Sequence, residues 1–314
     1  MILVTGASGF VGAAVLETAA GRGMVVRAVS RSVVTPLPSG GWSSVGDLCG
    51  DNDWREVLDG VETVVHCAAR VHVMVERSAD PLADFRRSNV LGTLNLARQA
   101  ADAGVRRMVF ISSVKVNGES TQPGMPFRAD DQPRPVDPYG VSKREAEQAL
   151  LELGRQRDME IVIIRPPLVY GPGVKANFAA MIKWLSRGVP LPFGAVTGNR
   201  RSLVALDNLV DLVLLCLHHP AAANRIFMVS DGEDLSTAGL LVRLARAMGR
   251  SPRLIPVPVP LLTLGASALG KQALAQRLLG NLQVDIGPTC GLLGWSPPVC
   301  IDEAMRRTVD GVRQ

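Results

Sequence analysis

Tyr139 and Lys143 are the residues of this chain whose types and spacing are best suited to chemistry. Tyr139 is one of only two tyrosines, and Lys143 follows it by one helical turn, so both side chains are expected on one face of a helix. A cation beside a phenol lowers its pKa from about 10, which allows proton exchange with an alcohol or ketone near neutral pH. The pair therefore predicts proton transfer at a carbon that carries oxygen.

Two adjacent serines, Ser112 and Ser113, end an apolar run that precedes this helix. A serine hydroxyl can hydrogen-bond the same substrate oxygen that the tyrosine protonates. With a nicotinamide present, these groups would serve hydride transfer at a carbinol carbon.

The N-terminus predicts a place for a dinucleotide. A short apolar strand at 2–4 leads into a turn with glycines at Gly6, Gly9 and Gly12, and a helix is expected to follow. Such a turn brings backbone N–H groups and a helix N-terminus against a pyrophosphate, where side chains would obstruct the approach. A second strand at 25–30 completes the expected context.

Strands and helices are expected to alternate through the first half of the chain. We predict strands near 2–4, 25–30, 62–66, 107–112 and 161–165, and helices near 11–20, 52–58, 82–103 and 138–156. This alternation predicts an α/β fold, a Rossmann-type doubly wound parallel sheet with helices on both faces. The carboxyl ends of parallel strands share one edge, so the residues that follow them should line one crevice.

The character of the sequence changes after residue 165, where prolines cluster and the elements become shorter. We expect helices near 176–187, 207–218, 236–248 and 301–312, and a strand near 202–205. The interpretation is a dinucleotide-binding domain at 1–165 and a smaller substrate-binding lobe at 166–314, with the chain crossing back to the sheet once or twice.

Composition bounds the function. The net charge is +5, but basic residues are scattered and only 4% of residues are aromatic, which argues against nucleic-acid binding. The five cysteines show no metal-binding spacing, so no metal site is expected, and reduced thiols suit the cytoplasm. The first strand begins at residue 2 and leaves no room for a signal peptide, and Pro256, Pro258 and Pro260 interrupt the longest apolar run, so no membrane association is expected.

Taken together, the chain resembles the extended short-chain dehydrogenase/reductase superfamily, which holds NAD-dependent epimerases and dehydratases. The resemblance spans nearly the whole chain and rests on the order and spacing of several fragments. They are Thr5-Gly6-x-x-Gly9-x-x-Gly12, Gly46-Asp47-Leu48, His66-Cys67-Ala68-Ala69, Asn89-Val90-Leu91-Gly92-Thr93, the set Ser113, Tyr139 and Lys143, and Arg165-Pro166-Pro167-Leu168-Val169-Tyr170-Gly171-Pro172.

The resemblance assigns roles to numbered residues. Ser113, Tyr139 and Lys143 would be catalytic, and Lys143 would also bind the nicotinamide ribose. The residues expected to hold the cofactor are Gly6, Ser8, Gly9, Phe10, Val11, Gly12, Ser30, Arg31, Asp47, Leu48, Ala68, Ala69, Tyr139, Lys143 and Pro166.

The end of the second strand bears on cofactor choice. NAD-specific sites usually carry an acid there, whereas this chain has Ser30-Arg31. An arginine suits a 2′-phosphate, so NADP(H) is favoured over NAD(H), with dual use still open. The alternative is an arginine that is merely solvated. His66, at another strand end, is expected to be a buried, hydrogen-bonded histidine rather than a catalytic base.

The segment that follows Ser112 and Ser113 bears on the substrate. The run from Ser112 to Glu119, with Lys115 two places after Ser113, looks like the branch that reduces a UDP-4-keto-6-deoxy-N-acetylhexosamine to an N-acetylquinovosamine-type sugar nucleotide. A surface lysine is the alternative for Lys115. Pro167 stands where many epimerases carry an asparagine that meets the substrate phosphates, which weakens the case for UDP-galactose or UDP-glucose as the substrate.

The resemblance also places the nucleotide end of a UDP-sugar. Asn177 follows the position where the family begins its nucleotide-binding helix, Phe193 would pack on uracil, and Arg201 would bind the pyrophosphate, with Arg200 as the fallback. Plain core packing is the alternative for Phe193. Ser112 and Lys115 complete the residues expected to bind substrate.

The favoured hypothesis is therefore an NADP(H)-dependent reductase of the C4 ketone of this UDP-sugar, in the synthesis of surface polysaccharide precursors. The alternative is an NAD-dependent UDP-sugar 4-epimerase, an isomerase that returns its hydride; net cofactor consumption separates the two. A non-catalytic, dinucleotide-sensing regulator is disfavoured by the intact Tyr139 and Lys143. A homodimer is expected, since helices near 89–103 and 141–153 carry apolar residues on more than one face and form the dimer interface in the family.

Overall fold

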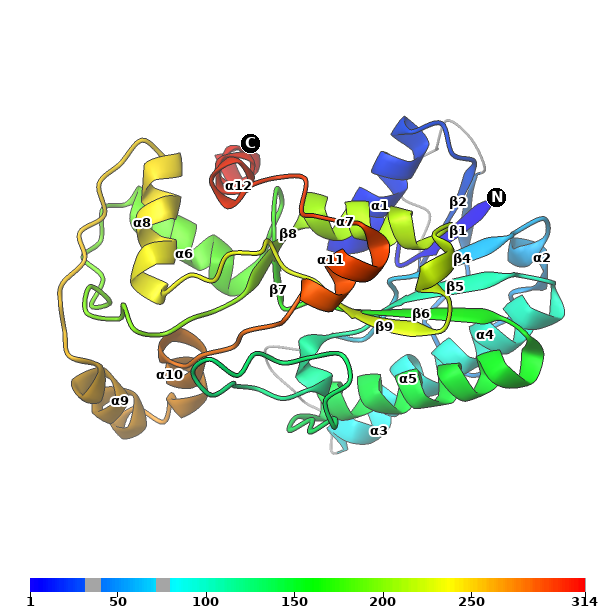
Figure 1. The fold of residues 1–314 in the computed structure, drawn as a ribbon, viewed down its shortest axis with the longest axis horizontal. Coiled ribbons are helices and arrows are strands. Elements are labelled where there is room, and N and C mark those ends of the chain that lie inside the picture. The colour runs from blue at the N-terminus through cyan, green and yellow to red at the C-terminus, as the bar shows by residue number, and fades with distance from the viewer. Residues whose placement is uncertain (32–40, 72–79, 314) are drawn as a thin grey trace.

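A seven-stranded parallel sheet organises the molecule (Figure 1). The computed structural model describes residues 1–31, 41–71 and 80–313. Along the sheet the strand order is β3-β2-β1-β4-β5-β6-β9. The strands are β1 Ile2–Thr5, β2 Val26–Ser30, β3 Trp42–Ser44, β4 Thr63–His66, β5 Arg107–Ile111, β6 Glu160–Arg165 and β9 Arg225–Met228. This confirms the predicted Rossmann-type α/β class.

Alternation along the strands builds two cores, one on each face of the sheet. In β5, Val109 and Ile111 enter one core, while Met108 and Phe110 enter the other. Successive side chains of a strand point to opposite faces, and a sheet covered on both faces needs apolar residues at every position. This requirement explains why the five residues of β5 are all buried and read as one apolar run after Arg107.

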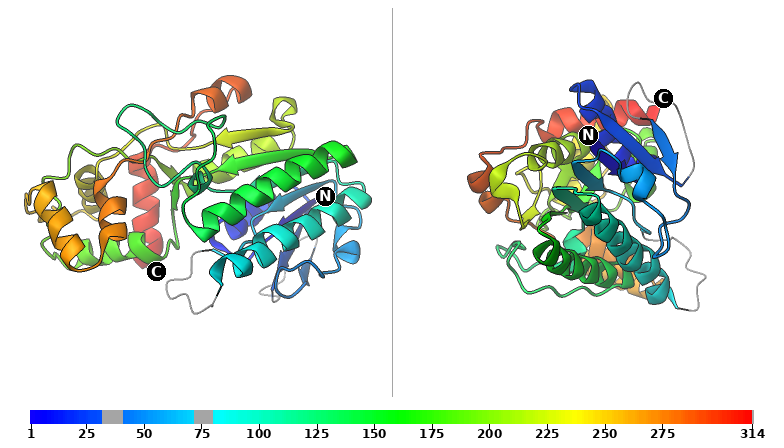
Figure 2. Two further views of the ribbon diagram at one scale, coloured as in Figure 1. Left: turned by 90° about the horizontal axis from the view of Figure 1, so that it is seen from below. Right: turned by 90° about the vertical axis from the view of Figure 1, so that its right-hand side faces the viewer.

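Helices cover both faces of the sheet (Figures 1 and 2). The helices α1 (Phe10–Gly21) and α7 (Leu206–Cys216) pack against each other over one face. The other face is covered by α2 (Arg55–Leu58), α4 (Thr93–Asp102) and α5 (Pro138–Arg157). Asp137 caps α5 by accepting a hydrogen bond from the Gly140 N–H at 2.7 Å, and so fixes the start of the helix at Pro138, one residue before Tyr139.

The helix predicted near 82–103 is interrupted. It consists of α3 (Pro81–Arg86), a π-helical stretch η1 (Arg87–Gly92) and then α4. A side chain at Gly92 would lie 2.6 Å from a carbon of Leu48, so the glycine lets this turn approach the segment after β3. Single π-helical turns often occur at functional sites, and this one lies beside the cleft described below.

The second half of the chain builds a third core around α6 (Ala176–Ser186), α8 (Thr237–Ala247) and α12 (Ile301–Arg313). A two-stranded parallel sheet, β7 (Leu168–Tyr170) with β8 (Leu203–Ala205), leads into it. Three further helices are α9 (Val259–Ala268), α10 (Gln272–Leu279) and α11 (Gly287–Leu293), and two short 3-10 turns are η2 (Val114–Val116) and η3 (Pro220–Ala222).

The sequence missed β3, β7 and β9 and the helices α9 to α11, which are short or, like α9, run through glycine and proline. The chain does cross back to the sheet after residue 165, with α7 on one face and β9 at the edge. The domain limits 1–165 and 166–314 stay a prediction.

Candidate active site

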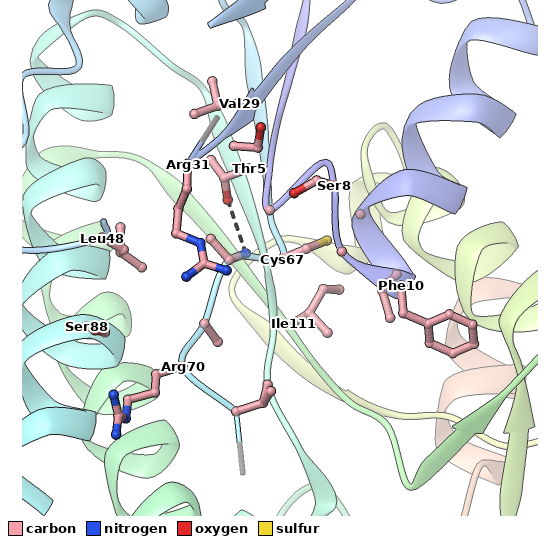
Figure 3. Close-up of a pocket in the computed structure, with 18 of the residues that line it drawn as sticks. Thr5, Ser8, Phe10, Val29, Arg31, Leu48, Cys67, Arg70, Ser88 and Ile111 are labelled. Carbon is pink, nitrogen blue, oxygen red and sulfur yellow. Dashed lines mark hydrogen bonds between the residues drawn. The ribbon is translucent and has the colours of Figure 1, made fainter. Parts of the chain in front are cut away.

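A cleft of about 940 Å³ lies where the strands of the sheet end (Figure 3). It is lined from the ends of β1, β2, β4, β5 and β6, the segment after β3, the α3–η1 region and the first turns of α1 and α5. The predicted crevice is therefore present, and residues far apart in the sequence meet there because parallel strands end at one edge.

Most residues singled out from the sequence line this cleft. The members expected to hold a cofactor are Gly6, Ser8, Gly9, Phe10, Val11, Gly12, Ser30, Arg31, Asp47, Leu48, Ala68, Ala69, Tyr139, Lys143 and Pro166, and all contribute to the lining. Ser112 and Ser113 line it as well. The structure brings these residues together, and their individual roles stay predictions.

The glycine turn is shaped for a close approach of backbone to ligand. Gly6 has φ +66°, and a Cβ there would lie 2.7 Å from the Ala68 nitrogen. A Cβ at Gly12 would lie 2.2 Å from the Gly6 carbonyl oxygen, and the Gly9 N–H donates to that oxygen at 2.8 Å. The turn therefore excludes side chains and presents the N-terminus of α1 to the cleft, which fits the pyrophosphate of a dinucleotide.

An exposed ion pair stands at the end of β2. The Arg31 guanidinium lies 3.7 Å from an Asp47 carboxylate oxygen, with the two side chains 81% and 88% exposed. In Figure 3, Arg31 lies on the same side of the pocket as Leu48, Ser88 and Arg70, while Ser8 and Phe10 lie on the other. An exposed pair of this kind contributes about 0–1 kcal/mol, so both side chains can turn toward a ligand at little cost.

His66 is a structural histidine, which confirms its interpretation. Its Nδ1 lies 2.6 Å from the Thr5 hydroxyl and its Nε2 lies 2.9 Å from the Thr93 hydroxyl, and the side chain is fully buried. Burial, aided by the charge of Lys143, lowers the pKa of His66 to about 3. A histidine that stays neutral here joins β1, β4 and α4 beneath the cleft floor.

Tyr139 and Lys143 occupy the first turns of α5 and both line the cleft, but they do not yet form the tuned pair that the sequence predicted. The Lys143 ammonium donates to the Ile111 carbonyl at 2.8 Å and lies 4.2 Å from the centroid of the Phe110 ring. Burial lowers the pKa of Lys143 to about 8. The Tyr139 ring packs edge-on against Phe85.

The expectation of a lowered pKa for Tyr139 is therefore wrong for the unliganded protein. Burial, and after it the nearby Asp137 carboxylate, raise the pKa of the phenol above its ordinary value. The cation that was expected to counter this effect is itself desolvated and engaged by the Ile111 carbonyl.

The two serines differ. The Ser112 hydroxyl is buried and donates to a Glu147 carboxylate oxygen at 2.5 Å. Ser113 is half-buried and caps the N-terminus of η2, where its hydroxyl accepts a hydrogen bond from the Lys115 N–H at 3.2 Å. Ser113 is thus the serine whose hydroxyl is available to a substrate oxygen, and Ser112 belongs to the supporting structure.

Behind the serines lies a buried ionic network that the sequence analysis missed. Two Arg165 nitrogens donate to the two Glu147 oxygens at 3.0 and 2.6 Å, and Arg165 also donates to the Asn117 side chain at 3.1 Å. Both members of the ion pair are buried. Glu147 follows Lys143 by one helical turn, so the network fixes the α5 face that carries the candidate catalytic groups to β5 and β6.

Asn89 makes a second supporting network. Its side chain exchanges hydrogen bonds with the Arg70 backbone at 2.8 and 3.0 Å and donates to the Ser142 hydroxyl at 3.0 Å. Ser142 in turn donates to the Tyr139 carbonyl at 2.8 Å. The π-helical turn η1 directs Asn89 inward. In the sequence, only the family fragment Asn89 to Thr93 indicated that Asn89 has a special position.

The substrate residues predicted beyond the sheet edge do not line the cleft. Lys115 forms ion pairs with Asp137 and with Glu119, the latter at 2.9 Å. Phe193 packs, partly buried, against the third core, and an Arg201 nitrogen donates to the Gly280 carbonyl at 3.3 Å. Burial lowers the pKa of Arg201. Asn177 lies in the first turn of α6, with its side chain outside the described part.

Over 1–31, 41–71 and 80–313, no group of three His, Cys, Asp or Glu side chains could hold a metal ion. Within the same ranges, no helix is long and apolar enough to span a membrane.

Comparison with known proteins identifies relatives along the whole chain. Residues 2–230 match the model of the NAD dependent epimerase/dehydratase family. A Vibrio cholerae protein named UDP-glucose 4-epimerase is 46% identical over 314 residues, covering 100% of this chain and 95% of the relative.

Solved structures agree on the fold. MoeE5 in complex with UDP-glucose and NAD is 26% identical, with a TM-score of 0.76 over 99% of this chain and 98% of the other. The UDP-N-acetylglucosamine 4-epimerase of Bacillus cereus reaches a TM-score of 0.81 over 100% and 99% of the two chains at 20% identity.

These findings overturn the favoured hypothesis of a UDP-4-keto-sugar reductase. The relative at 46% identity is named for epimerisation, and Lys115, the residue that most suggested the reductase branch, lies outside the cleft lining in ion pairs with two acids. A local likeness of a few residues carries less weight than identity along the whole chain.

Proposed function

This chain belongs to the NAD dependent epimerase/dehydratase family, and we propose that it interconverts the C4 epimers of a UDP-sugar. The observation that carries the proposal is the 46% identity to a UDP-glucose 4-epimerase over the full length of the chain. The lining of the cleft supports it, because Ser113, Tyr139 and Lys143 meet there beside the glycine turn.

The cleft residues suit NAD as the resident cofactor. The glycine turn would hold the pyrophosphate, and Ala68 and Ala69 leave room for the ligand at the end of β4. When bound, NAD supplies a hydride acceptor for the sugar C4 and a positive charge near the phenol, which would offset the raised pKa of Tyr139.

Proton transfer falls to Tyr139. Its phenolate oxygen would take the proton of the C4 hydroxyl and later return it to the same oxygen. Burial lowers the pKa of Lys143 to about 8. Its ammonium would stabilise the phenolate of Tyr139 once it leaves the Ile111 carbonyl. The Ser113 hydroxyl would donate to the sugar O4 and hold it in place.

Epimerisation needs one anchor that stays fixed while the sugar presents its other face. We assign that anchor to the nucleotide end, held by the lobe after β6, where Arg201 offers a partly buried guanidinium. The planar fork of arginine suits a diphosphate. Phe193 and Asn177 remain the proposed uracil and nucleotide contacts.

The position of Asp47 argues against the preference for NADP(H) that was predicted from Arg31. Asp47 supplies a carboxylate 3.7 Å from Arg31, so an acid does stand beside the end of β2. A carboxylate repels a 2′-phosphate, while it accepts from a ribose hydroxyl. We therefore propose NAD as the working cofactor, with Arg31 lending only a secondary tolerance of NADP.

The proposal is tested by incubating the protein with UDP-glucose or UDP-N-acetylglucosamine and following the sugar by proton NMR. We expect an equilibrium mixture of C4 epimers without added cofactor, because the hydride is borrowed and returned. Tyr139→Phe should form the mixture about 10²–10⁴-fold more slowly. Stoichiometric oxidation of added NADPH or NADH without epimer formation would contradict the proposal.

We also propose a homodimer through α4 and α5, which lie side by side on one face of the sheet. Leu91, just before α4, is 54% exposed, and Leu94 and Leu151 are only partly buried. Equilibrium sedimentation should give twice the mass of 33.4 kDa. A single species at the chain mass would contradict the dimer.

A further inference from the structure

Helix α9 is an apolar helix with no buried residue. Its leucines at 261 and 264, and Leu269 just after it, are 58%, 68% and 72% exposed. Residues 261, 264, 265 and 268 share one face of the helix by their spacing, and that face contains only leucine, glycine and alanine. Isolated exposed leucines are ordinary, but an exposed helical face without any polar side chain is not.

The surface extends beyond α9. Helix α9 packs against α10, and these two helices, residues 259–279, are here named the α9–α10 hairpin. Ile255, ahead of it, is 50% exposed, and Leu274 in α10 is 41% exposed. The hydroxyl of Thr263 donates to the Val259 carbonyl at 3.0 Å, so this polar group is satisfied within the helix. The hairpin is thus suited to an apolar environment.

Along the sequence, the charged residues in and beside the hairpin are basic, and one of them, Arg243, is paired with Glu233 and Asp302. Residues 254–270 contain no charged side chain, and exposed Arg253 and Lys271 bracket them. From 235 to 284 the sequence has six basic residues and no acidic one. An apolar helical surface flanked by cations is complementary to a surface that is apolar inside and anionic outside.

The hairpin stands at one end of the molecule. Figures 1 and 2 place α9 at the end of the long axis opposite the strands of the main sheet, with α10 beside it. Just after α10, the Gly280 carbonyl accepts a hydrogen bond from Arg201, which ties this end of the hairpin to the rest of the lobe. A flat surface could therefore meet α9 without closing the cleft at the sheet edge.

We infer that the α9–α10 hairpin docks this protein on the surface of a bilayer that contains anionic phospholipid. A second copy of the chain is the less fitting occupant, because a two-fold contact would bring the cations of both hairpins together with no acid in either. A bilayer accepts the exposed leucines among its acyl chains and Arg253 and Lys271 among its headgroups. This docking lies in the membrane plane and involves no span.

The test is flotation of the full-length protein with vesicles, which does not depend on catalytic activity. The vesicles contain phosphatidylcholine alone or with about 30% phosphatidylglycerol, an anionic content in the range that attracts basic segments. We expect the protein to float with the anionic vesicles and much less with the neutral ones, and added salt should weaken flotation by screening the cations.

Two variants separate the apolar and cationic contributions. The double change Leu264→Glu with Leu269→Glu should abolish flotation, whereas Arg253→Gln with Lys271→Gln should weaken binding to anionic vesicles about 30-fold, from ~1 kcal/mol per cation near the surface. Val25→Glu is the matched control. Val25 is 54% exposed directly before β2, far from α9 in the sequence, and the variant should float like the unchanged protein.

Several outcomes would overturn the inference. The first is that the protein floats with neither the neutral nor the anionic vesicles. The second is that the leucine variant floats like the parent while its circular dichroism spectrum also matches the parent. A leucine variant that instead converts a dimer to a monomer, with no vesicle binding in the parent, would assign the surface to a second copy of the chain. Because flotation is measured without substrate, a failed epimerase assay leaves this test intact.

Discussion

The edge of the main sheet and the lobe beyond β6 differ in how well the sequence predicts where the site residues lie. At the sheet edge, glycines and serines that follow strand ends line one cleft together with Tyr139 and Lys143 from the first turns of α5. In the lobe, Phe193 packs against a core, and Arg201 is held by isolated backbone bridges to Leu235 and Leu282. Register between parallel strands fixes where their ends lie, while loops joined by single bridges have no such rule.

The contrast extends to what holds each region. The sheet edge is fixed by buried polar groups, with Glu147 and Arg165 on one side and His66 between two threonines on the other. The far end of the lobe exposes apolar side chains on α9 instead. A reaction centre needs fixed geometry, whereas a docking surface needs exposure.

The largest effect should come from removing the phenol at the sheet edge. Tyr139→Phe keeps the ring against Phe85 but removes the oxygen that we propose exchanges the proton. We expect turnover to fall by about 10²–10⁴-fold, the usual contribution of general acid–base catalysis, with NAD affinity little changed. Turnover is measured by epimer formation and affinity by titration. Turnover close to that of the parent would remove Tyr139 from the chemistry.

The next effect should come from the buried ion pair behind the cleft. Glu147→Ala leaves the Arg165 guanidinium buried without its carboxylate, which should lower the free energy of unfolding by about 3–5 kcal/mol. The matched control is Glu152→Ala on the same helix, where the ion pair with Arg155 is exposed and the loss should be below about 1 kcal/mol. Urea unfolding followed by circular dichroism measures both. Equal losses would show that the network does not secure α5.

Arg201→Ala sharpens the comparison from the side of the lobe. If the guanidinium binds the diphosphate, UDP affinity should fall about tenfold or more, since a hydrogen bond to a charged group contributes about 1.5–3 kcal/mol. The control is Arg200→Ala, whose side chain is exposed and donates to the Thr197 carbonyl at 2.8 Å. Calorimetric titration with UDP should show little change in that variant. A larger loss for Arg200 would move the diphosphate contact to that residue.

Near neutral pH the smallest effect is a pH dependence of stability that comes from His66, and this effect grows as the pH falls. Its folded pKa of about 3 lies below the ordinary value of 6.5, so the unfolded chain binds the proton that the folded chain refuses. Stability should be unaffected above pH 6.5 and fall by up to about 1.4 kcal/mol per pH unit below it, toward pH 3.

His66→Asn removes this titration and should flatten that part of the profile, whatever its effect on absolute stability. The measurement is the midpoint of urea unfolding over the acidic range for both proteins. Parallel profiles for parent and variant would mean that His66 is not kept neutral by the fold.

Several particulars show what sequence reasoning could and could not supply. The glycine turn and the Tyr139–Lys143 spacing were readable because both depend on local geometry. The pKa of Tyr139 was not, since it depends on burial and on the Ile111 carbonyl that engages Lys143. The Glu147–Arg165 pair joins residues 18 apart that only the packing of α5 on β6 brings together.

The reductase hypothesis failed for a related reason. Lys115 was interpreted from its neighbours in the sequence, but in the structure its ammonium is paired with Asp137 and Glu119. The exposed α9 helix was passed over because its prolines ruled out a membrane span, which is a different question from whether an apolar face is exposed.

The measurement that tests the central claim most directly is the fate of a deuterium placed at C4 of UDP-glucose. If the protein takes a hydride from C4 and returns it to the same carbon, the product UDP-galactose keeps the deuterium at C4, and no reduced nicotinamide accumulates. Loss of the label to solvent, or reduced nicotinamide formed in step with product, would contradict the account of this protein as a 4-epimerase.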